Sequence, residues 1–188
     1  VLTIGTVGAA LPLSEGFEGL TAIPSGWSLY NGNAGSAVWE INSTVARTGT
    51  KSMGFNNCDG DGSTDMTGRI DRVYTKNYNF STVSTASLTF DVAYALLTYS
   101  SVPYPDKLNI LTSTDCGVNW TQVYSKSGAT LASAPGYTSI ATCWVPSGTS
   151  QWRNDAINLN SLAGQSNVMI AFENTSSWGT WIYIDNIN

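Results

Sequence analysis

The strongest constraint on the fold is an alternation of large apolar residues between Ser87 and Leu96. Successive side chains of an extended strand point to opposite faces of the sheet, so residues two apart share a face. The residues on the apolar face of this segment are Leu88, Phe90, Val92, Tyr94 and Leu96. A helix would distribute the same residues around its axis. The segment therefore predicts a β-strand with one buried face.

The same alternation recurs in short segments that are separated by Gly, Asn, Ser and Pro. We expect further strands at residues 106–112, 122–124, 154–159, 167–172 and 180–187. The best helical candidate, Ser161 to Gly164, is one turn long. Many short strands with turn signals between them are typical of sandwiches and jelly rolls. We therefore expect residues 1–188 to form a single all-β domain, an antiparallel β-sandwich of jelly-roll type, excised from a larger multi-domain protein.

Composition and charge exclude several classes of function. The chain has no His, which removes Ser-His-Asp and Cys-His catalysis and His-ligated zinc. Its 8 Lys and Arg against 13 Asp and Glu give a net charge of −5, so it lacks the basic face that nucleic-acid binding requires. No apolar run reaches the roughly 18 residues of a membrane span. Abundant Ser, Thr and Asn with few Lys indicate a secreted or cell-surface protein.

One turn has a specific signature. Residues 113–120 read Ser-Thr-Asp-Cys-Gly-Val-Asn-Trp, which is the spacing of an Asp-box hairpin. The carboxylate of Asp115 can accept backbone N–H groups across the turn, and Gly117 can adopt positive φ. A sialidase-type site is the functional interpretation of such a turn. We favour the structural interpretation, in which Trp120 packs back under the hairpin.

Four segments, taken in order, resemble one family. They are Glu15-Gly16-Phe17-Glu18-Gly19 with Pro24-Ser25-Gly26-Trp27, Leu88 to Tyr94, Ser113 to Gly117 with Trp120, and Tyr183-Ile184-Asp185-Asn186-Ile187. This ordered set is similar to the choice-of-anchor J and cleaved-adhesin domains, relatives of the MAM domain. The resemblance covers about residues 14–187. It implies a jelly-roll sandwich with structural calcium in a secreted or surface-attached bacterial protein. It also implies attached proteases or glycoside hydrolases and a role in adhesion or substrate binding.

The three cysteines, Cys58, Cys116 and Cys143, leave one over after a single disulfide. Three dispersed Cys without His offer too few ligands for zinc. In the family pattern, the Cys after Ser-Thr-Asp commonly lacks a partner. The resemblance therefore implies that Cys58 pairs with Cys143 and that Cys116 stays free.

The densest acidic stretch suggests a calcium loop. Asp59, Asp61, Ser63 and Asp65 alternate with small residues, as oxygen ligands do at the start of such loops. Ile70 occupies the position of the bidentate Glu of an EF-hand, so this would be a simpler oxygen cage. The alternative is a solvated polar hairpin tip.

A second calcium site is suggested by position. Asp185 shares strand parity with Trp181 and Tyr183, and a carboxylate on an apolar face is costly unless it is paired or metal-bound. The resemblance assigns the matching ligand positions to Glu18, Asn56, Asp71 and Asp185. The alternative is a hydrogen-bonded carboxylate that caps a turn.

The aromatic residues suggest what the domain binds. Trp27, Trp39 and Trp120 lie in or beside the family motifs, and we expect them to be packed. Four other rings lie in loops without an obvious apolar partner: Tyr99, Tyr104, Trp144 and Trp178. Exposed rings are flat platforms on which sugar C–H faces stack. The alternative is that these rings cover an edge of the core.

Two classes of function therefore remain. The first is a non-catalytic carbohydrate-binding module that carries an attached enzyme or cell surface to a polysaccharide or other glycan. The second is an adhesion or architectural domain that contacts proteins or neighbouring domains through a flat apolar patch. Catalysis is the weaker interpretation, because no spacing marks the pair of carboxylates that glycoside hydrolysis needs.

Overall fold

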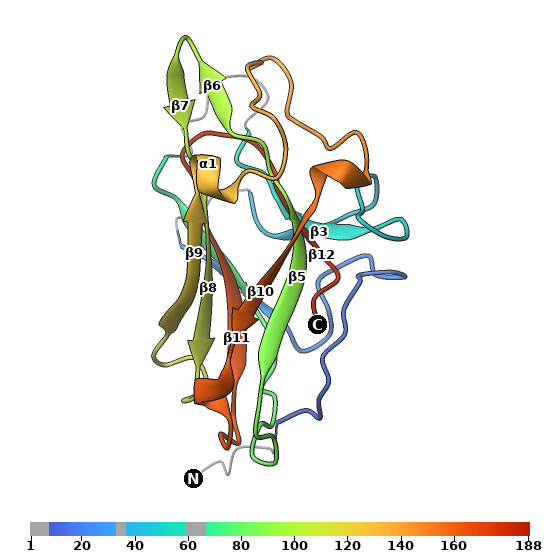
Figure 1. Cartoon of the computed structure of the whole chain (residues 1–188), viewed down its shortest axis with the longest axis vertical. Coiled ribbons are helices and arrows are strands. Elements are labelled where there is room, and N and C mark those ends of the chain that lie inside the picture. Colours follow the sequence, from blue (N-terminus) through green and yellow to red (C-terminus); the bar gives the residue numbers. More distant parts are fainter. Residues whose placement is uncertain (1–7, 33–36, 59–66) are drawn as a thin grey trace.

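The computed structural model describes residues 8–32, 37–58 and 67–188. Within these residues the chain forms two five-stranded antiparallel sheets and a separate two-stranded hairpin (Figure 1). Sheet A has the order β1 (Ser28–Asn31), β4 (Ile70–Tyr74), β11 (Met169–Thr175), β8 (Lys107–Ser113) and β9 (Thr121–Ser127). Sheet B has the order β10 (Arg153–Asn158), β5 (Ser87–Ala93), β12 (Ile182–Asp185), β3 (Ser52–Phe55) and β2 (Glu40–Asn42). The hairpin pairs β6 (Leu97–Tyr99) with β7 (Val102–Tyr104). The predicted all-β class is confirmed.

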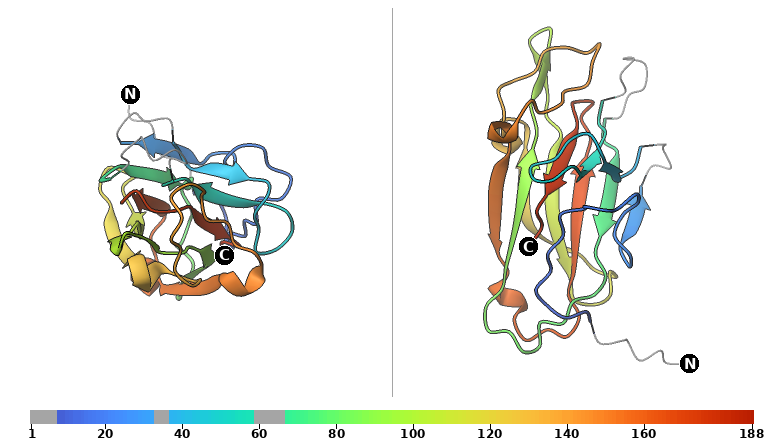
Figure 2. Two further views of the ribbon diagram at one scale, coloured as in Figure 1. Left: turned by 90° about the horizontal axis from the view of Figure 1, so that it is seen from above. Right: turned by 90° about the vertical axis from the view of Figure 1, so that its right-hand side faces the viewer.

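The two sheets pack face to face and form a sandwich, whose layers are visible from above in Figure 2. Phe90 on β5 meets Phe172 on β11 edge to face, with ring centroids 5.6 Å apart. Both rings are fully buried, and each fully buried ring of this size stabilises the fold by roughly 2–3 kcal/mol. On the predicted apolar face of 87–96, Leu88, Phe90, Val92 and Tyr94 are buried, while Leu96 is half-buried. The alternation therefore predicts the core face correctly.

Helical structure among the described residues is limited to single turns. These are α1 (Gly128–Leu131) and the 3₁₀ turns η1 (Thr149–Gln151) and η2 (Asn160–Leu162). The turn η2 overlaps the helical candidate expected at 161–164. No helix in the described part of the chain is long and apolar enough to span a membrane.

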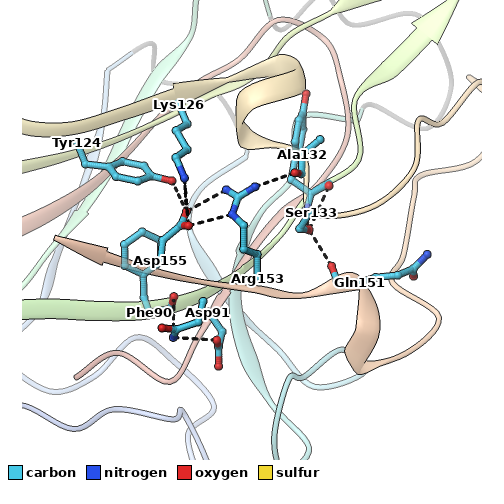
Figure 3. A network of polar contacts seen from close by, with 11 residues as sticks. Phe90, Asp91, Tyr124, Lys126, Ala132, Ser133, Gln151, Arg153 and Asp155 are labelled. Atoms are coloured by element: carbon cyan, nitrogen blue, oxygen red, sulfur yellow. Dashed lines mark hydrogen bonds and ion pairs between the residues drawn. The ribbon is translucent and has the colours of Figure 1, made fainter.

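One open side of the sandwich is closed by polar contacts between the edge strands β9 and β10. Figure 3 shows Tyr124, Lys126 and Arg153 converging on Asp155. The Tyr124 hydroxyl donates to Asp155 at 2.6 Å, and Lys126 Nζ and Arg153 Nε lie 3.1 and 2.9 Å from its carboxylate oxygens. Burial opposes ionisation, but hydrogen bonds from Arg153, Tyr124 and Lys126 outweigh it and lower the pKa of Asp155 to about 2. The carboxylate thus links the two sheets.

The Asp-box turn has the geometry that its sequence predicts. Asp115 accepts the Asn119 backbone N–H at 2.9 Å and the Ser113 hydroxyl at 2.7 Å. Gly117 has φ +84°. Trp120 packs against the turn and meets Tyr74 with ring centroids 5.8 Å apart. These side chains hold the turn together, in line with the structural interpretation.

The disulfide is the one that the family resemblance implies. Cys58 is bonded to Cys143 across a sequence separation of 85 residues. Cys116 is an exposed free thiol. The bridge ties the segment after β3 to the long connection between α1 and η1.

Candidate functional site

The hairpin of β6 and β7 projects beyond the sheets at one end of the molecule (Figure 1). Ser100 and Ser101 both have positive φ, 50° and 65°, which is the geometry of a tight two-residue hairpin turn. Tyr99 and Val102 flank this turn and are 41% and 52% exposed. The hairpin therefore presents an aromatic and an aliphatic side chain to solvent.

The base of this hairpin carries an aromatic pair. Tyr104 and Trp178 meet at a centroid distance of 5.1 Å with their planes 65° apart. Both rings are half-buried, and Trp178 adopts φ +60°, a left-handed conformation that is rare for a bulky residue. The pair thus joins the hairpin to the loop between β11 and β12.

Asp106 holds the Trp178 loop in this conformation. Its carboxylate accepts the backbone N–H groups of Ser177 at 2.8 Å, Gly179 at 3.1 Å and Thr180 at 2.8 Å. Any side chain at position 179 would collide with the carboxylate, because a Cβ there would lie 2.0 Å from Asp106 Oδ2. The loop is therefore fixed by one residue that is 71 or more positions away in sequence.

The electrostatics of Asp106 reflect its burial. The residue is fully buried, and desolvation raises the pKa of its carboxyl to about 7, although the loop N–H groups oppose this shift. The neighbouring Tyr94 hydroxyl accepts the Asp106 backbone N–H at 3.1 Å. The sequence pattern predicts Asp106 only as the first residue of the strand at 106–112. Its one signal was a carboxylate directly before a buried apolar segment.

The four aromatic rings that we expected to be exposed in loops differ in location and exposure. Tyr99, Tyr104 and Trp178 come from the hairpin and the loop that contacts it. Trp144 does not join them: it is only 6% exposed and packs against Tyr183 at 6.3 Å. The disulfide at Cys143 holds this segment against sheet B, so Trp144 covers an apolar cluster instead of offering a platform.

Two of the expected calcium ligands anchor the same segment of backbone. Glu18 accepts the N–H groups of Thr50 and Lys51, both at 2.9 Å, and these bonds lower the pKa of its carboxyl. Asp185, which is fully buried, accepts the N–H groups of Arg47 at 2.8 Å and Thr48 at 3.1 Å. Burial raises the pKa of Asp185, and these hydrogen bonds oppose the shift. Protein donors thus already compensate both carboxylates.

Asp71, another expected calcium ligand, has a different environment from Glu18 and Asp185. It is 1% exposed, and neither carboxylate oxygen accepts a hydrogen bond from the described residues. The nearby Gly32 N–H donates to the Ile70 carbonyl at 3.1 Å. Burial raises the pKa of the Asp71 carboxyl, and the positive charge of Arg69 and the nearby Gly32 N–H oppose that shift. A buried carboxylate without donors is the chemical environment that a bound cation would relieve.

The remaining expected calcium ligands give less support for a metal site. Asn56 uses its side-chain oxygen to accept the Cys58 N–H at 2.9 Å, as a turn cap does. Asp59, Asp61 and Asp65 lie outside the described residues. Among the residues that the structure describes, no three acidic or thiol side chains come together as a metal cluster. Among the expected ligands that the structure describes, Asp71 therefore has the environment that best fits a cation.

Comparison with known proteins connects this architecture to others. No family model matches the chain, and no curated protein matches it. The K3 cleaved-adhesin domain of Lys-gingipain from Porphyromonas gingivalis w83 superposes with a TM-score of 0.67, at 13% identity over 93% of this chain and 95% of that one. The K1 domain gives 0.61 at 16% identity, with the same shares covered. The chain has the fold of the cleaved-adhesin domains. The expected resemblance is confirmed for the fold.

Carbohydrate-binding modules share this cleaved-adhesin architecture. TmCBM61 in complex with β-1,4-galactotriose has a TM-score of 0.55 at 14% identity, over 92% of this chain and 91% of that chain. The family 11 module of Clostridium thermocellum, in complex with a β-1,3-1,4-mixed-linked tetrasaccharide, gives 0.52 at the same identity and coverage. At these identities the likeness shows the fold alone.

The two outer faces of this cleaved-adhesin fold are covered to different extents. The outer face of sheet B carries a second apolar cluster in which Trp144 and Trp152 pack on Tyr183. On the outer face of sheet A, Tyr30 is 48% exposed and Ile70 is 37% exposed. Loops thus bury the centre of one face, while the other presents an aromatic ring to solvent.

Proposed function

We propose that this domain is a non-catalytic carbohydrate-binding module of a secreted or cell-surface protein. In this proposal it brings an attached enzyme or surface to a polysaccharide through Tyr99, Tyr104 and Trp178. The observation that carries the proposal is the contact of Tyr104 with Trp178 at 5.1 Å, on a loop that Asp106 fixes. Ligand platforms need such rigid placement, because ordering a mobile loop would offset part of the binding free energy.

The chemistry of this end suits a neutral or weakly charged glycan. Aromatic rings supply apolar planes for the C–H faces of sugars. The chain carries only eight Lys and Arg, so it offers little charge to attract a sulfated or uronic-acid polymer. The carbohydrate-binding modules with the same fold support this class of ligand.

The test is retention on insoluble polysaccharides, measured for the wild type and for single variants. Trp178→Ala should lower retention at least tenfold and leave the melting temperature within a few degrees, because the ring is half-buried at the surface. Val118→Ala is the matched control, since Val118 is 77% exposed on the Asp-box turn. Absence of wild-type retention on a broad panel would contradict the proposal.

Adhesion to a protein partner is the second candidate, and the tip of the hairpin favours it. Tyr99 and Val102 are cross-strand partners, and both are largely exposed. Adjacent exposed apolar side chains of this kind occur at protein contact sites. Val102→Glu should weaken such a contact and leave glycan retention unchanged, which separates the two functions.

We further propose that the domain is stabilised by calcium, with Asp71 as a ligand. The support is the burial of its carboxylate without donors from the described residues. Carboxylate oxygens are the ligands that calcium prefers, and a doubly charged ion would offset the desolvation of Asp71. Glu18 and Asp185 serve in this proposal as anchors of the 47–51 segment.

A further inference from the structure

The segment from Ala9 to Glu15 joins the two sheets near the end of the molecule opposite the hairpin, where the chain begins in Figure 1. Beyond β4, Ala9 donates to the Asn77 carbonyl at 2.8 Å and accepts the Asn79 N–H at 2.9 Å. Beyond β12, Glu15 and Ile187 exchange two backbone hydrogen bonds of 2.8 and 2.9 Å. Both ends of this segment, which we call the strap, are thus fixed by the sheets.

An apolar cavity of about 360 Å³ lies between the strap and the sheets. Leu11 and Leu13 line it from the strap, and Val83 and Ala86 line it from the connection between β4 and β5. These four side chains are half-buried, whereas Leu88 lines the cavity from the core. An apolar group in the cavity would remove their remaining apolar surface from water, which is favourable.

The volume of the cavity sets the size of a ligand. An apolar protein cavity of about 150 Å³ holds one benzene molecule. The cavity at the strap therefore has room for an apolar group of about eight to ten carbon atoms, since part of its volume is open to solvent. Because the strap is held by hydrogen bonds before any ligand binds, a ligand does not need to order this wall.

A second cavity, of about 480 Å³, adjoins the first and has a polar lining. The two cavities share Thr85, Ala86 and Ser87, and Asn158 and Asn160 also line the second. Asn160 Oδ1 accepts the Ala86 N–H and Asn158 Oδ1 accepts the Asn160 N–H, both at 2.8 Å. These bonds fix the two amides close to the exposed hydroxyl groups of Thr85 and Ser87. Hydroxyls and amides of this kind both donate and accept hydrogen bonds with an uncharged polar group.

The lining also selects the charge of the ligand. Among the described residues that line the two cavities, none is Asp, Glu, Lys or Arg. A charged group carried into such a site would lose its hydration without gaining a partner. The net charge of −5 on the chain further disfavours an anion. The site therefore suits an uncharged molecule with one apolar and one polar end.

We propose that the cavity at the strap binds the alkyl chain of an uncharged amphiphile, with the hydroxyl groups of its head in the adjoining polar cavity. A medium-chain monoacylglycerol has this chemistry. The site lies at the end of the molecule away from Tyr104 and Trp178. It is a second binding activity that goes beyond the proposed function and does not rest on it.

Titration of the full chain with a series of 1-alkanols, followed by methyl NMR, tests the proposal. The methyl resonances of Leu11, Leu13 and Val83 should shift and saturate. From 1-hexanol to 1-octanol, affinity should rise about fourfold for each added methylene, the factor expected for burying one methylene, and it should level off beyond 1-decanol. Affinity that does not depend on chain length would overturn the proposal, as would equal shifts at the exposed methyls of Val118.

Two further probes test the polar end of the ligand. Octanoate should bind roughly tenfold more weakly than 1-octanol, because its carboxylate finds no partner in the lining. 1-Monooctanoylglycerol should bind more tightly than 1-octanol, because its additional hydroxyl groups reach the adjoining cavity. Equal affinity for octanoate would overturn the preference for an uncharged ligand. Equal affinity for 1-monooctanoylglycerol would overturn the place of the head group.

A charged substitution in the wall tests the location. Val83→Asp should weaken 1-octanol binding roughly tenfold, and it should keep the melting temperature within a few degrees, because Val83 is half-buried in a loop. Val118→Asp is the matched control, since Val118 is 77% exposed on the Asp-box turn. Wild-type affinity in a folded Val83→Asp protein would overturn the site. Trp178→Ala should keep 1-octanol binding, so loss of polysaccharide retention and loss of alkanol binding are separate results.

Discussion

The carboxylate of Asp106 receives the backbone N–H groups of Ser177 and Gly179, the residues on either side of Trp178. One buried side chain thus sets the left-handed conformation of Trp178 and the position of its ring against Tyr104. The candidate site therefore depends on a residue that itself lies in the interior and cannot touch a ligand.

Replacing Asp106 tests whether glycan binding requires the position of the Trp178 ring and not only its presence. In Asp106→Ala, three backbone N–H groups lose their acceptor, and we expect a loss of about 3 kcal/mol in the free energy of unfolding. Glycan retention should fall to the level of Trp178→Ala even though the ring is present. Urea denaturation and polysaccharide retention measure the two effects. Wild-type retention in a folded Asp106→Ala protein would contradict the role of the loop.

The pH dependence of stability should show a maximum in mildly acidic solution. The folded-state pKa of Asp106 is raised to about 7, so its contribution to stability is present below about pH 4 and is lost as the pH rises to 7. The pKa of Asp155 is lowered to about 2, so its contribution is present above about pH 4 and is lost as the pH falls to 2. The melting temperature, measured in chelator from pH 2 to 8, should therefore peak near pH 4 to 5.

Two variants identify the groups responsible for this pH profile. Asp106→Asn should flatten the decline between pH 4 and 7, and Asp155→Asn should flatten the acid limb. A wild-type melting temperature that rises steadily from pH 4 to 7 would show that Asp106 is ionised in the folded protein throughout this range.

The sequence predicts those parts of the fold that are determined by residues close together in the chain. The alternation around Phe90 sets which face of β5 is buried, whatever strand lies opposite. The spacing of Asp115 and Gly117 determines a turn within eight residues. The burial of Trp144 is not predictable in this way, because it depends on a disulfide to a segment 85 residues away and on the sheet against which the ring packs.

The candidate site likewise depends on residues that lie far apart in the sequence. Asp106 is a strand-terminal residue in the sequence and acts on a loop more than 70 positions away. On the outer face of sheet A, the strand register places one residue of each strand side by side, so no single segment carries the signal of this row: Tyr30, Arg72, Glu173, Asn109 and Ser125. Only the register aligns Arg72, Glu173 and Asn109.

Removal of the disulfide should destabilise the fold without altering the candidate site at Tyr104 and Trp178. Closing a loop of 85 residues lowers the entropy of the unfolded chain, and the expected loss for Cys58→Ser with Cys143→Ser is about 3 kcal/mol. Urea denaturation measures this loss, and Cys116→Ser is the control, since that thiol is exposed and unpaired. Unchanged stability in the double variant would show that the segment holding Trp144 is fixed by packing alone.

Calcium removal should reverse the order of stability of the wild type and Asp71→Asn. With calcium at about 100 times its dissociation constant, a bound ion stabilises the folded state by about 2.7 kcal/mol, so the wild type should melt above the variant. In chelator the wild type keeps a buried carboxylate without donors from the described residues, whereas the amide is uncharged, so the variant should melt higher.

Asp185→Asn is the matched control: it loses backbone hydrogen bonds in both conditions and should keep the response to chelator. Differential scanning calorimetry with calcium and with chelator measures all three proteins, and an identical wild-type melt in both conditions would rule out a stabilising ion at Asp71.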